Sequence, residues 1–290
     1  MTDPSTVLIA GCGYVGTRLG LDLADAGHYA VGLRRSPSEL PAGIRPLTAD
    51  LTSPELPEAL SAAGPFQQVV YATAADGGTP EAYHRAYVEG LENLIAALET
   101  GAHPVSRLLF VSSTGVYGDH GGGEVDESTP TAPESFRGAV MVEAESVALS
   151  APWPSAALRL GGIYGPGRTR ILDRVRAGEA RFTSGPPIWS NRIHRDDAAG
   201  ALAHLLALPA EELDPVWLGV DAEPVPLREI YRWLARRLDA PEPREDPSLR
   251  RDRSNKRCIS RKLQESGYEF LYPSFREGYG EMIEAEEHAG

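Results

Sequence analysis

Lysine, cysteine and long hydrophobic runs are scarce in this sequence. Of its 28 basic residues only Lys256 and Lys262 are lysines, which excludes any mechanism that needs a lysine before residue 256. Two cysteines, Cys12 and Cys258, set no disulfide framework, and the chain starts without a basic segment, so we expect a cytoplasmic protein. No apolar run approaches the roughly 18 residues that cross a bilayer, which predicts no membrane partner.

Positive charge is also in short supply. The 28 basic residues face 41 acidic ones, a net charge of −13, so the chain is poorly matched to a phosphate backbone and we expect no nucleic-acid partner. No group of histidines and cysteines has metal-ligand spacing, which predicts no metal site. The 290 residues, 42% of them hydrophobic, have ordinary globular composition and suffice for one large domain or two small ones.

Short apolar runs alternate with helical patterns along the first half of the chain. We expect helices at about 81–98 and 134–149, and strands at residues 7–10, 30–33, 69–72, 108–111 and 156–160. This alternation is typical of βαβ crossovers, which place parallel strands in one sheet with helices on both faces. The predicted fold is therefore α/β, with a Rossmann-type doubly wound parallel sheet.

The composition changes after about residue 165. Glycine, proline and arginine become frequent, and helical patterns follow around 196–208, 227–238 and 275–287. We expect a dinucleotide-binding Rossmann domain over residues 1–165 and a smaller substrate-side region over residues 166–290. Within the second region, a segment at about 190–220 is expected to return to the Rossmann core.

A glycine-rich turn follows the first predicted strand and opens a predicted helix. Its pattern is G-x-G-x-x-G, in which the first glycine permits a tight turn, the second lets a pyrophosphate approach the backbone, and the third lets helix and strand pack closely. The helix N-terminus supplies amide groups and positive potential for the phosphates. The sequence therefore predicts a dinucleotide site formed by Gly11, Cys12, Gly13, Tyr14, Val15 and Gly16.

The end of the second predicted strand bears on which dinucleotide binds. An acidic residue at this point would accept the ribose 2′-hydroxyl of NAD(H), but the chain has Arg34, Arg35 and Ser36 here. Arginine binds a phosphate through two parallel hydrogen bonds, which favours NADP(H), with NAD(H) as the other possibility. The alternative is that both arginines are merely solvated on a surface turn.

Further segments resemble those of a known family. The run 111–118 resembles the strand end with a catalytic serine, 158–168 resembles an R-x-x-x-x-Y-G-P-G segment, and 191–199 resembles an N-x-I-H-V-x-D-x-A segment. Together they resemble the short-chain dehydrogenases/reductases, in the extended NAD(P)-dependent epimerase/dehydratase branch. The variant glycine loop and the run 254–257 (Ser-Asn-Lys-Arg) resemble a YeeZ-like atypical subgroup.

The resemblance implies roles for particular residues. Ser113 takes the position of the catalytic hydroxyl, and the cofactor site extends to Asp50, Leu51 and Ala72. On the substrate side the matching positions are Tyr164, Arg168, Asn191 and His194, although a histidine in this segment is also compatible with a structural hydrogen-bonding role.

The family's Tyr-x-x-x-Lys pair has no counterpart in the helix expected after Ser113. Aligning Gly138 and Glu145 with the family pattern places Arg137 at the tyrosine position and Met141 at the lysine position. Arginine cannot exchange protons, because its pKa exceeds about 12. Proton-transfer groups typically contribute about 10²–10⁴-fold in rate, so we do not expect the family's usual mechanism.

Ser113, Tyr117 and Arg137 are the remaining candidates for catalytic residues. Tyr117 is the phenol nearest to Ser113 in sequence, and Arg137 would provide a fixed positive charge for an anionic substrate. Packing beneath the strand end is the alternative for Tyr117, and an exposed helix position the alternative for Arg137.

Two functions remain open from the sequence. One is an oxidoreductase of the epimerase/dehydratase type with an atypical active site, acting on a small polar or anionic substrate of unknown identity. The other is a catalytically silent NADP(H)-sensing regulator or interaction protein. The chain is expected to be a monomer or a homodimer.

Overall fold

The computed structural model describes residues 4–36, 39–249 and 254–289. The chain packs into two compact units. The first comprises residues 1–116, 135–159 and 198–217, and the second comprises 117–134, 160–197 and 218–290. These units are defined by packing, and the expected domain limits of 1–165 and 166–290 remain predictions.

A seven-stranded sheet forms the centre of the first unit, in the order β12-β7-β5-β4-β1-β2-β3. The pairings of β1 with β2 and β4, of β4 with β5, and of β2 with β3 are all parallel. The strands are β1 (Thr6–Ala10), β2 (Tyr29–Arg34), β3 (Ile44–Thr48), β4 (Gln68–Tyr71), β5 (Arg107–Ser113), β7 (Ser155–Leu160) and β12 (Val216–Gly219). The predicted Rossmann-type sheet is confirmed, and β3 and β12 are additions to the expected strands.

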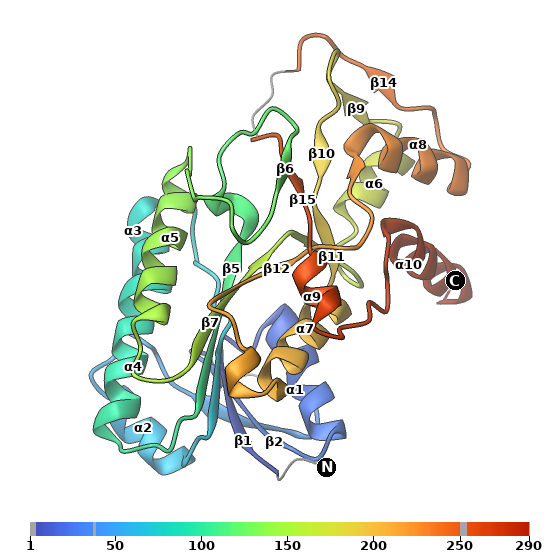
Figure 1. Cartoon of the computed structure of the whole chain (residues 1–290). Coiled ribbons are helices and arrows are strands. Elements are labelled where there is room, and N and C mark those ends of the chain that lie inside the picture. Colours follow the sequence, from blue (N-terminus) through green and yellow to red (C-terminus); the bar gives the residue numbers. More distant parts are fainter. Residues whose placement is uncertain (1–3, 37–38, 250–253, 290) are drawn as a thin grey trace. The chain divides into compact units, whose positions relative to one another are not determined.

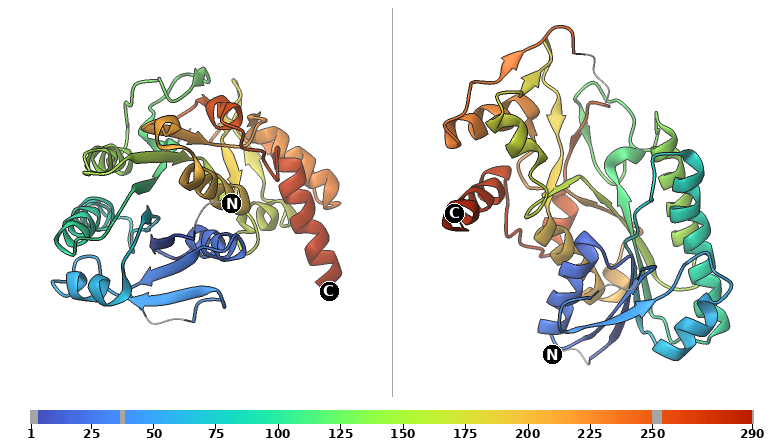
Figure 2. Two further views of the ribbon diagram at one scale, coloured as in Figure 1. Left: turned by 60° about the horizontal axis from the view of Figure 1, so that its bottom comes forward. Right: turned by 180° about the vertical axis from the view of Figure 1, so that it is seen from behind.

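Helices cover both faces of this sheet. Helices α2, α4 and α5 lie on one face and α1 and α7 on the other (Figures 1 and 2). Their bounds are α1 (Tyr14–Asp25), α2 (Leu56–Ala63), α4 (Gly90–Thr100), α5 (Phe136–Leu149) and α7 (Arg195–Ala207). Because both faces are covered, the central strands are apolar over most of their length: Val7, Leu8, Ile9 and Ala10 of β1 are fully buried.

The helix expected over residues 81–98 is interrupted. A short α3 (Pro80–His84) leads through a π-helical turn (Arg85–Glu89) into α4. At this turn the hydroxyls of Tyr71 and Thr73 donate hydrogen bonds to the carbonyl of Ala86, at 2.6 and 3.2 Å. Side-chain donors that enter the helical hydrogen-bond ladder in this way locally change its pitch, which periodicity alone does not reveal.

A buried polar network joins β5, α5 and β7. The carboxylate of Glu145 accepts hydrogen bonds from Ser112 Oγ at 2.5 Å and from Arg159 Nε and Nη2 at 2.9 and 2.7 Å. All three residues are buried. Glu145, one of the two residues on which the family alignment depends, therefore fixes α5 against β5, the strand that carries Ser113.

The second unit consists of short strands and helices around its own core. Its helices are α6 (Arg170–Arg176), α8 (Leu227–Arg237), α9 (Arg261–Glu265) and α10 (Phe275–Ala289). Its strands are β6 (Glu124–Val125), β8 (Gly162–Tyr164), β9 (Arg181–Phe182), β10 (Trp189–Ser190), β11 (Arg192–His194), β13 (Val225–Pro226), β14 (Arg244–Glu245) and β15 (Arg257–Cys258). Aromatic and aliphatic side chains from α6, α8 and α10 share one cluster that includes Leu172, Leu234, Phe275 and Tyr279.

None of the helices in the described part of the chain combines the length and hydropathy that a bilayer-spanning segment requires.

Candidate functional site

The glycine loop has three glycines in three different environments. Gly11 has φ of +89°, and a Cβ there would lie 2.5 Å from the backbone nitrogen of Thr73. A Cβ on Gly16 would lie 2.8 Å from the carbonyl oxygen of Gly11 and 2.9 Å from Ile9 Cγ2. A Cβ on Gly13 would meet nothing closer than 3.9 Å. Thus Gly11 and Gly16 are needed by the fold itself, whereas Gly13 leaves open space beside the backbone.

Helix α1 begins immediately after this open position. Its N-cap is Gly13, which provides no side-chain cap, and its first turn carries no acidic residue. The unpaired amide groups of a helix N-terminus and its positive potential attract an anion. The loop is therefore well suited to the pyrophosphate of a dinucleotide, with Tyr14, Val15 and Gly16 forming the first turn.

The backbone of Cys12 forms part of this loop, and its side chain is buried. The thiol is fully buried, and burial raises its pKa. Its carbonyl oxygen accepts hydrogen bonds from Arg34 Nε and from Thr17 Oγ1. Arg34, at the end of β2, thus holds the loop in place through its side chain.

Arg35 and Ser36 are exposed just beyond β2. The guanidinium of Arg35 donates two hydrogen bonds to the carboxylate of Asp76, which lies in the segment after β4. The two side chains are 53% and 63% exposed, and the hydrogen bond from Arg35 lowers the pKa of Asp76. Arg35 is therefore an accessible cation beside the glycine loop, with one carboxylate as its current partner.

The other predicted cofactor residues follow β3 and β4. Asp50 is exposed and accepts hydrogen bonds from the backbone nitrogen and the hydroxyl of Thr52, both at 2.8 Å, which lower its pKa. Leu51 is mostly buried, and Ala72 donates its amide to Ala10 at 2.7 Å. All the predicted cofactor residues belong to the first unit and follow strands β1 to β4.

Ser113 is the last residue of β5 and is partly exposed. Its Oγ accepts a hydrogen bond from the amide of Gly115 at 3.1 Å, so its own proton is available to a substrate oxygen. Arg137 lies in the first turn of α5, where its guanidinium packs over the rings of Tyr83 and Phe136 at 5.5 and 5.2 Å. Neither tyrosine nor lysine occurs in α5.

Tyr117 belongs to the second unit and is almost completely buried. Its hydroxyl donates a hydrogen bond to the carbonyl oxygen of Asp126 at 2.7 Å. This geometry favours the packing interpretation of Tyr117 over a role in proton exchange.

Sequence reasoning missed a lysine beside Tyr117. Lys256 is 5% exposed, and its Nζ donates to the carbonyl oxygen of Tyr117 at 3.0 Å and to Ser254 Oγ at 2.7 Å. Burial lowers its pKa. The signal was present in the sequence, since a chain with 26 arginines keeps only two lysines and one of them lies in the run 254–257.

All four predicted substrate residues make contacts within the second unit. The ring of Tyr164 packs on those of His194 and Tyr279, with centroids 5.3 and 4.4 Å away, and burial raises the pKa of Tyr164 and lowers that of His194. Asn191 links the carbonyl of Lys256 to the amide of Cys258 at 3.0 and 2.8 Å.

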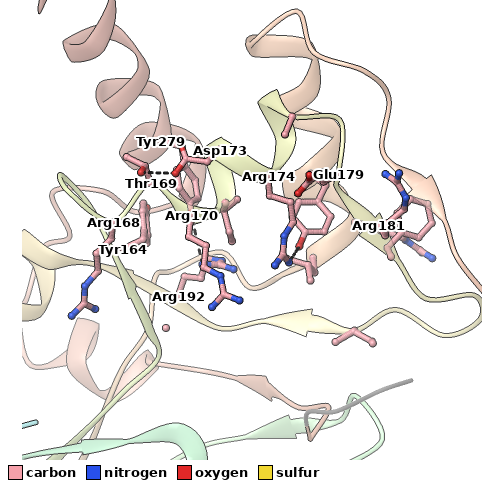
Figure 3. A pocket seen from close by; sticks show the side chains of 18 of the residues that line it. Tyr164, Arg168, Thr169, Arg170, Asp173, Arg174, Glu179, Arg181, Arg192 and Tyr279 are labelled. Carbon is pink, nitrogen blue, oxygen red and sulfur yellow. Dashed lines mark hydrogen bonds between the residues drawn. The ribbon is translucent and has the colours of Figure 1, made fainter. Parts of the chain in front are cut away.

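Arg168, the fourth, lines a cavity of about 1180 Å³ in the same unit (Figure 3). Tyr164 also reaches its wall. Nowhere in the described ranges do three histidine, cysteine or carboxylate side chains group in a way that could hold a metal ion.

A comparison with known proteins finds a solved structure that is similar over nearly the whole chain. A solved structure from Methylobacillus flagellatus, which is described only as a member of the NAD-dependent epimerase/dehydratases, is 37% identical with a TM-score of 0.80. The match covers 98% of this chain and 99% of that one.

Two curated proteins are also similar. The 2-alkyl-3-oxoalkanoate reductase of Stenotrophomonas maltophilia is 29% identical over 256 residues, which are 81% of this chain and 76% of the reductase. Protein YeeZ of Escherichia coli is 33% identical over 190 residues, which are 64% of this chain and 65% of YeeZ, so the match spans slightly less than two thirds of that relative.

The family model itself matches residues 7–215, well over half of the chain, and this range includes the glycine loop, Ser113 and the segment 191–199. The chain therefore belongs to the NAD-dependent epimerase/dehydratase family, within the short-chain dehydrogenases/reductases.

Proposed function

We propose that this protein is an NADP(H)-dependent oxidoreductase that acts on a small anionic substrate. One observation carries the choice of cofactor. The strand that would end in an acidic residue for NAD(H) ends instead in Arg34, and the guanidinium of Arg35, the next residue, is accessible. A 2′-phosphate is the group that such an arginine binds best.

Each candidate residue has a definite task in this proposal. The amides at the start of α1 hold the pyrophosphate, and the bound nicotinamide supplies or accepts a hydride. Ser113 donates a hydrogen bond to the substrate oxygen, because it accepts from the amide of Gly115 and its own proton is left available. Arg137 contributes a permanent positive charge that an anionic substrate or a developing oxyanion would favour.

The name of one relative supports an anionic substrate. A 2-alkyl-3-oxoalkanoate carries a carboxylate near a ketone, and the reductase named for it is 29% identical to this chain. Reduction of such a ketone takes a hydride from the nicotinamide at carbon and a proton from solvent, by way of the Ser113 hydroxyl, at oxygen, and a cationic group would bind the carboxylate. Arg137 is suited to the last of these tasks.

Arg35→Ala is expected to lower the affinity for NADPH about 10- to 100-fold, because a hydrogen bond to a charged group contributes about 1.5–3 kcal/mol. The affinity for NADH should stay within about twofold, since NADH lacks the phosphate. Calorimetric titration of both proteins with both nucleotides measures this difference. An equal loss for the two nucleotides, or no loss for either, would refute the assignment of Arg35.

Asp76→Asn is expected to change the affinity for NADPH in the opposite direction. The carboxylate of Asp76 competes with a 2′-phosphate for Arg35, and an exposed ion pair contributes up to about 1 kcal/mol. We expect NADPH to bind about two- to fivefold more tightly, with the affinity for NADH unchanged. The double variant with Arg35→Ala should lose this gain in affinity for NADPH. A gain that persists without Arg35 would show that Asp76 does not compete with the 2′-phosphate for Arg35.

A catalytically silent sensor of NADP(H) is the second candidate. The observation that favours it is the absence of tyrosine and lysine from α5. A sensor distinguishes NADPH from NADP⁺ in its affinity for a partner protein. Oxidation of NADPH on addition of oxo acids, measured at 340 nm, would decide for the oxidoreductase.

A further inference from the structure

The cavity in the second unit is lined by an unusual number of arginines. Its described lining contains two carboxylates, Asp173 and Glu179, and six guanidinium groups, those of Arg168, Arg170, Arg174, Arg181, Arg192 and Arg228. This is an excess of four positive charges in a chain whose net charge is −13. The cavity therefore concentrates positive potential against the overall charge of the protein.

Three of these arginines, Arg170, Arg174 and Arg228, pair with no carboxylate of the described residues. Arg170 and Arg228 form no hydrogen bond or ion pair with any residue that the structure describes. Arg174 reaches the hydroxyl of Tyr231 at 3.3 Å. The carboxylate of Asp173 accepts a hydrogen bond from Thr169 Oγ1 at 2.8 Å and pairs with Arg176, which does not line the cavity. One of the two acids is thus already committed elsewhere.

Arg192 is partly buried. Its Nε is buried without a hydrogen-bond partner among the described residues, while one terminal nitrogen donates to Tyr279 Oη at 3.2 Å. Burial raises the pKa of Asp221, the carboxyl group that interacts electrostatically with Arg192, well above its ordinary value, which limits how far Asp221 can neutralise Arg192. A buried, unsatisfied donor is costly, and an anion in the cavity would satisfy it.

The guanidinium groups are spread along the cavity. Figure 3 shows Arg170 and Arg192 directed to one part of it, Arg174 beside Glu179, and Arg181 at the far end. Arg181 donates to the carbonyl oxygens of Gly178 and Ala180 at 2.8 and 3.0 Å, which fixes its position. Positive charge is therefore available at more than one place along the lining of the cavity.

We infer that this cavity binds a small molecule with two separate phosphate monoesters, one at Arg170 and Arg192 and the other toward Arg174 and Arg181. Each phosphate monoester carries a charge of about −1.5 to −2 near pH 7, so two of them match the excess of four positive charges, whereas two carboxylates do not. One guanidinium group can donate two parallel hydrogen bonds to the oxygens of one phosphate. Arginines at separate places along the cavity therefore suit two separate phosphates. The identification of this molecule as the substrate rests on the proposed function, but its binding does not.

Calorimetric titration of the full chain with fructose 1,6-bisphosphate, fructose 6-phosphate and citrate tests the inference. We expect the bisphosphate to bind at least tenfold more tightly than the other two, with an affinity that falls as salt is added. Equal or tighter binding of citrate would identify a carboxylate site and overturn the inference. Equal binding of the monophosphate would do the same.

Substitutions locate the site. Arg170→Gln and Arg192→Gln should each lower the affinity for the bisphosphate at least tenfold. Arg170 is exposed, so its variant is not expected to disturb folding. The matched control is Arg236→Gln, an exposed arginine of α8 that does not line the cavity, and it should change the affinity less than twofold. Equal effects in Arg170→Gln and Arg236→Gln would place the bisphosphate outside the cavity and overturn the inference.

NADPH titrations in the same variants separate the two proposals. If Arg170→Gln binds NADPH with unchanged affinity but no longer binds the bisphosphate, the inference is supported. If wild-type protein binds NADPH but does not discriminate among the three anions, the inference fails and the proposed function stands. If it discriminates among them but binds no NADPH, the proposed function fails and the cavity assignment stands.

Discussion

Glu145→Ala is expected to lower the free energy of unfolding by about 3–5 kcal/mol, the usual effect of removing one partner from a buried ion pair. The carboxylate of Glu145 accepts three hydrogen bonds from Ser112 and Arg159, and all three residues are buried. Without it, the buried guanidinium of Arg159 loses the carboxylate that pairs with it, and Ser112 loses its acceptor. Urea unfolding followed by circular dichroism measures the loss.

Two variants test the cause of this loss. Glu143→Ala removes an exposed carboxylate of the same helix, whose ion-pair partner is the exposed His84, and should change stability by less than about 0.5 kcal/mol. Replacing Glu145 and Arg159 together by methionine should recover much of the stability, because no unpaired charge then remains. A double variant as unstable as Glu145→Ala would show that lost packing, rather than the unpaired charge, causes the effect.

Gly13→Ala is expected to lower the affinity for NADPH at least about 100-fold while leaving the fold intact. A Cβ on Gly13 meets nothing closer than 3.9 Å in the protein, but it would occupy the space through which a pyrophosphate approaches the amides of α1. Loss of two hydrogen bonds to a charged group, at about 1.5–3 kcal/mol each, gives this magnitude. Calorimetry measures the affinity, and thermal unfolding of the free protein measures the fold.

Gly16→Ala provides the contrast. A Cβ there would lie 2.8 Å from the carbonyl oxygen of Gly11 and 2.9 Å from Ile9 Cγ2, so overpacking should cost about 1–3 kcal/mol of stability in the free protein. The two glycines thus separate binding from folding within a single turn. Wild-type affinity for NADPH in Gly13→Ala would mean that the pyrophosphate does not lie against this loop.

The remaining predictions depend on single arginines. Arg35 with Asp76 should decide the preference for NADPH, and Arg170 and Arg192 should decide the binding of a bisphosphate. Because each measurement is a binding constant, none of them requires that the substrate be known.

The sequence by itself determined the fold and the cofactor loop. Buried parallel strands are apolar along most of their length, so β1 and β5 are visible as short apolar runs between helical patterns. The glycine loop is equally local: Gly11, Gly13 and Gly16 lie within six consecutive residues, and their spacing follows from the turn between one strand and one helix.

Only the tertiary structure decided which charged residues act together. Lys256 contacts a residue 139 positions away, and Arg35 pairs with Asp76 across two intervening strands of the sequence. The arginines of the cavity come from β8–α6, β9, β11 and α8 and have the same local pattern as solvated surface arginines. Hydrophobic periodicity reports which face of an element is buried, but the position of one long charged side chain depends on packing between distant segments.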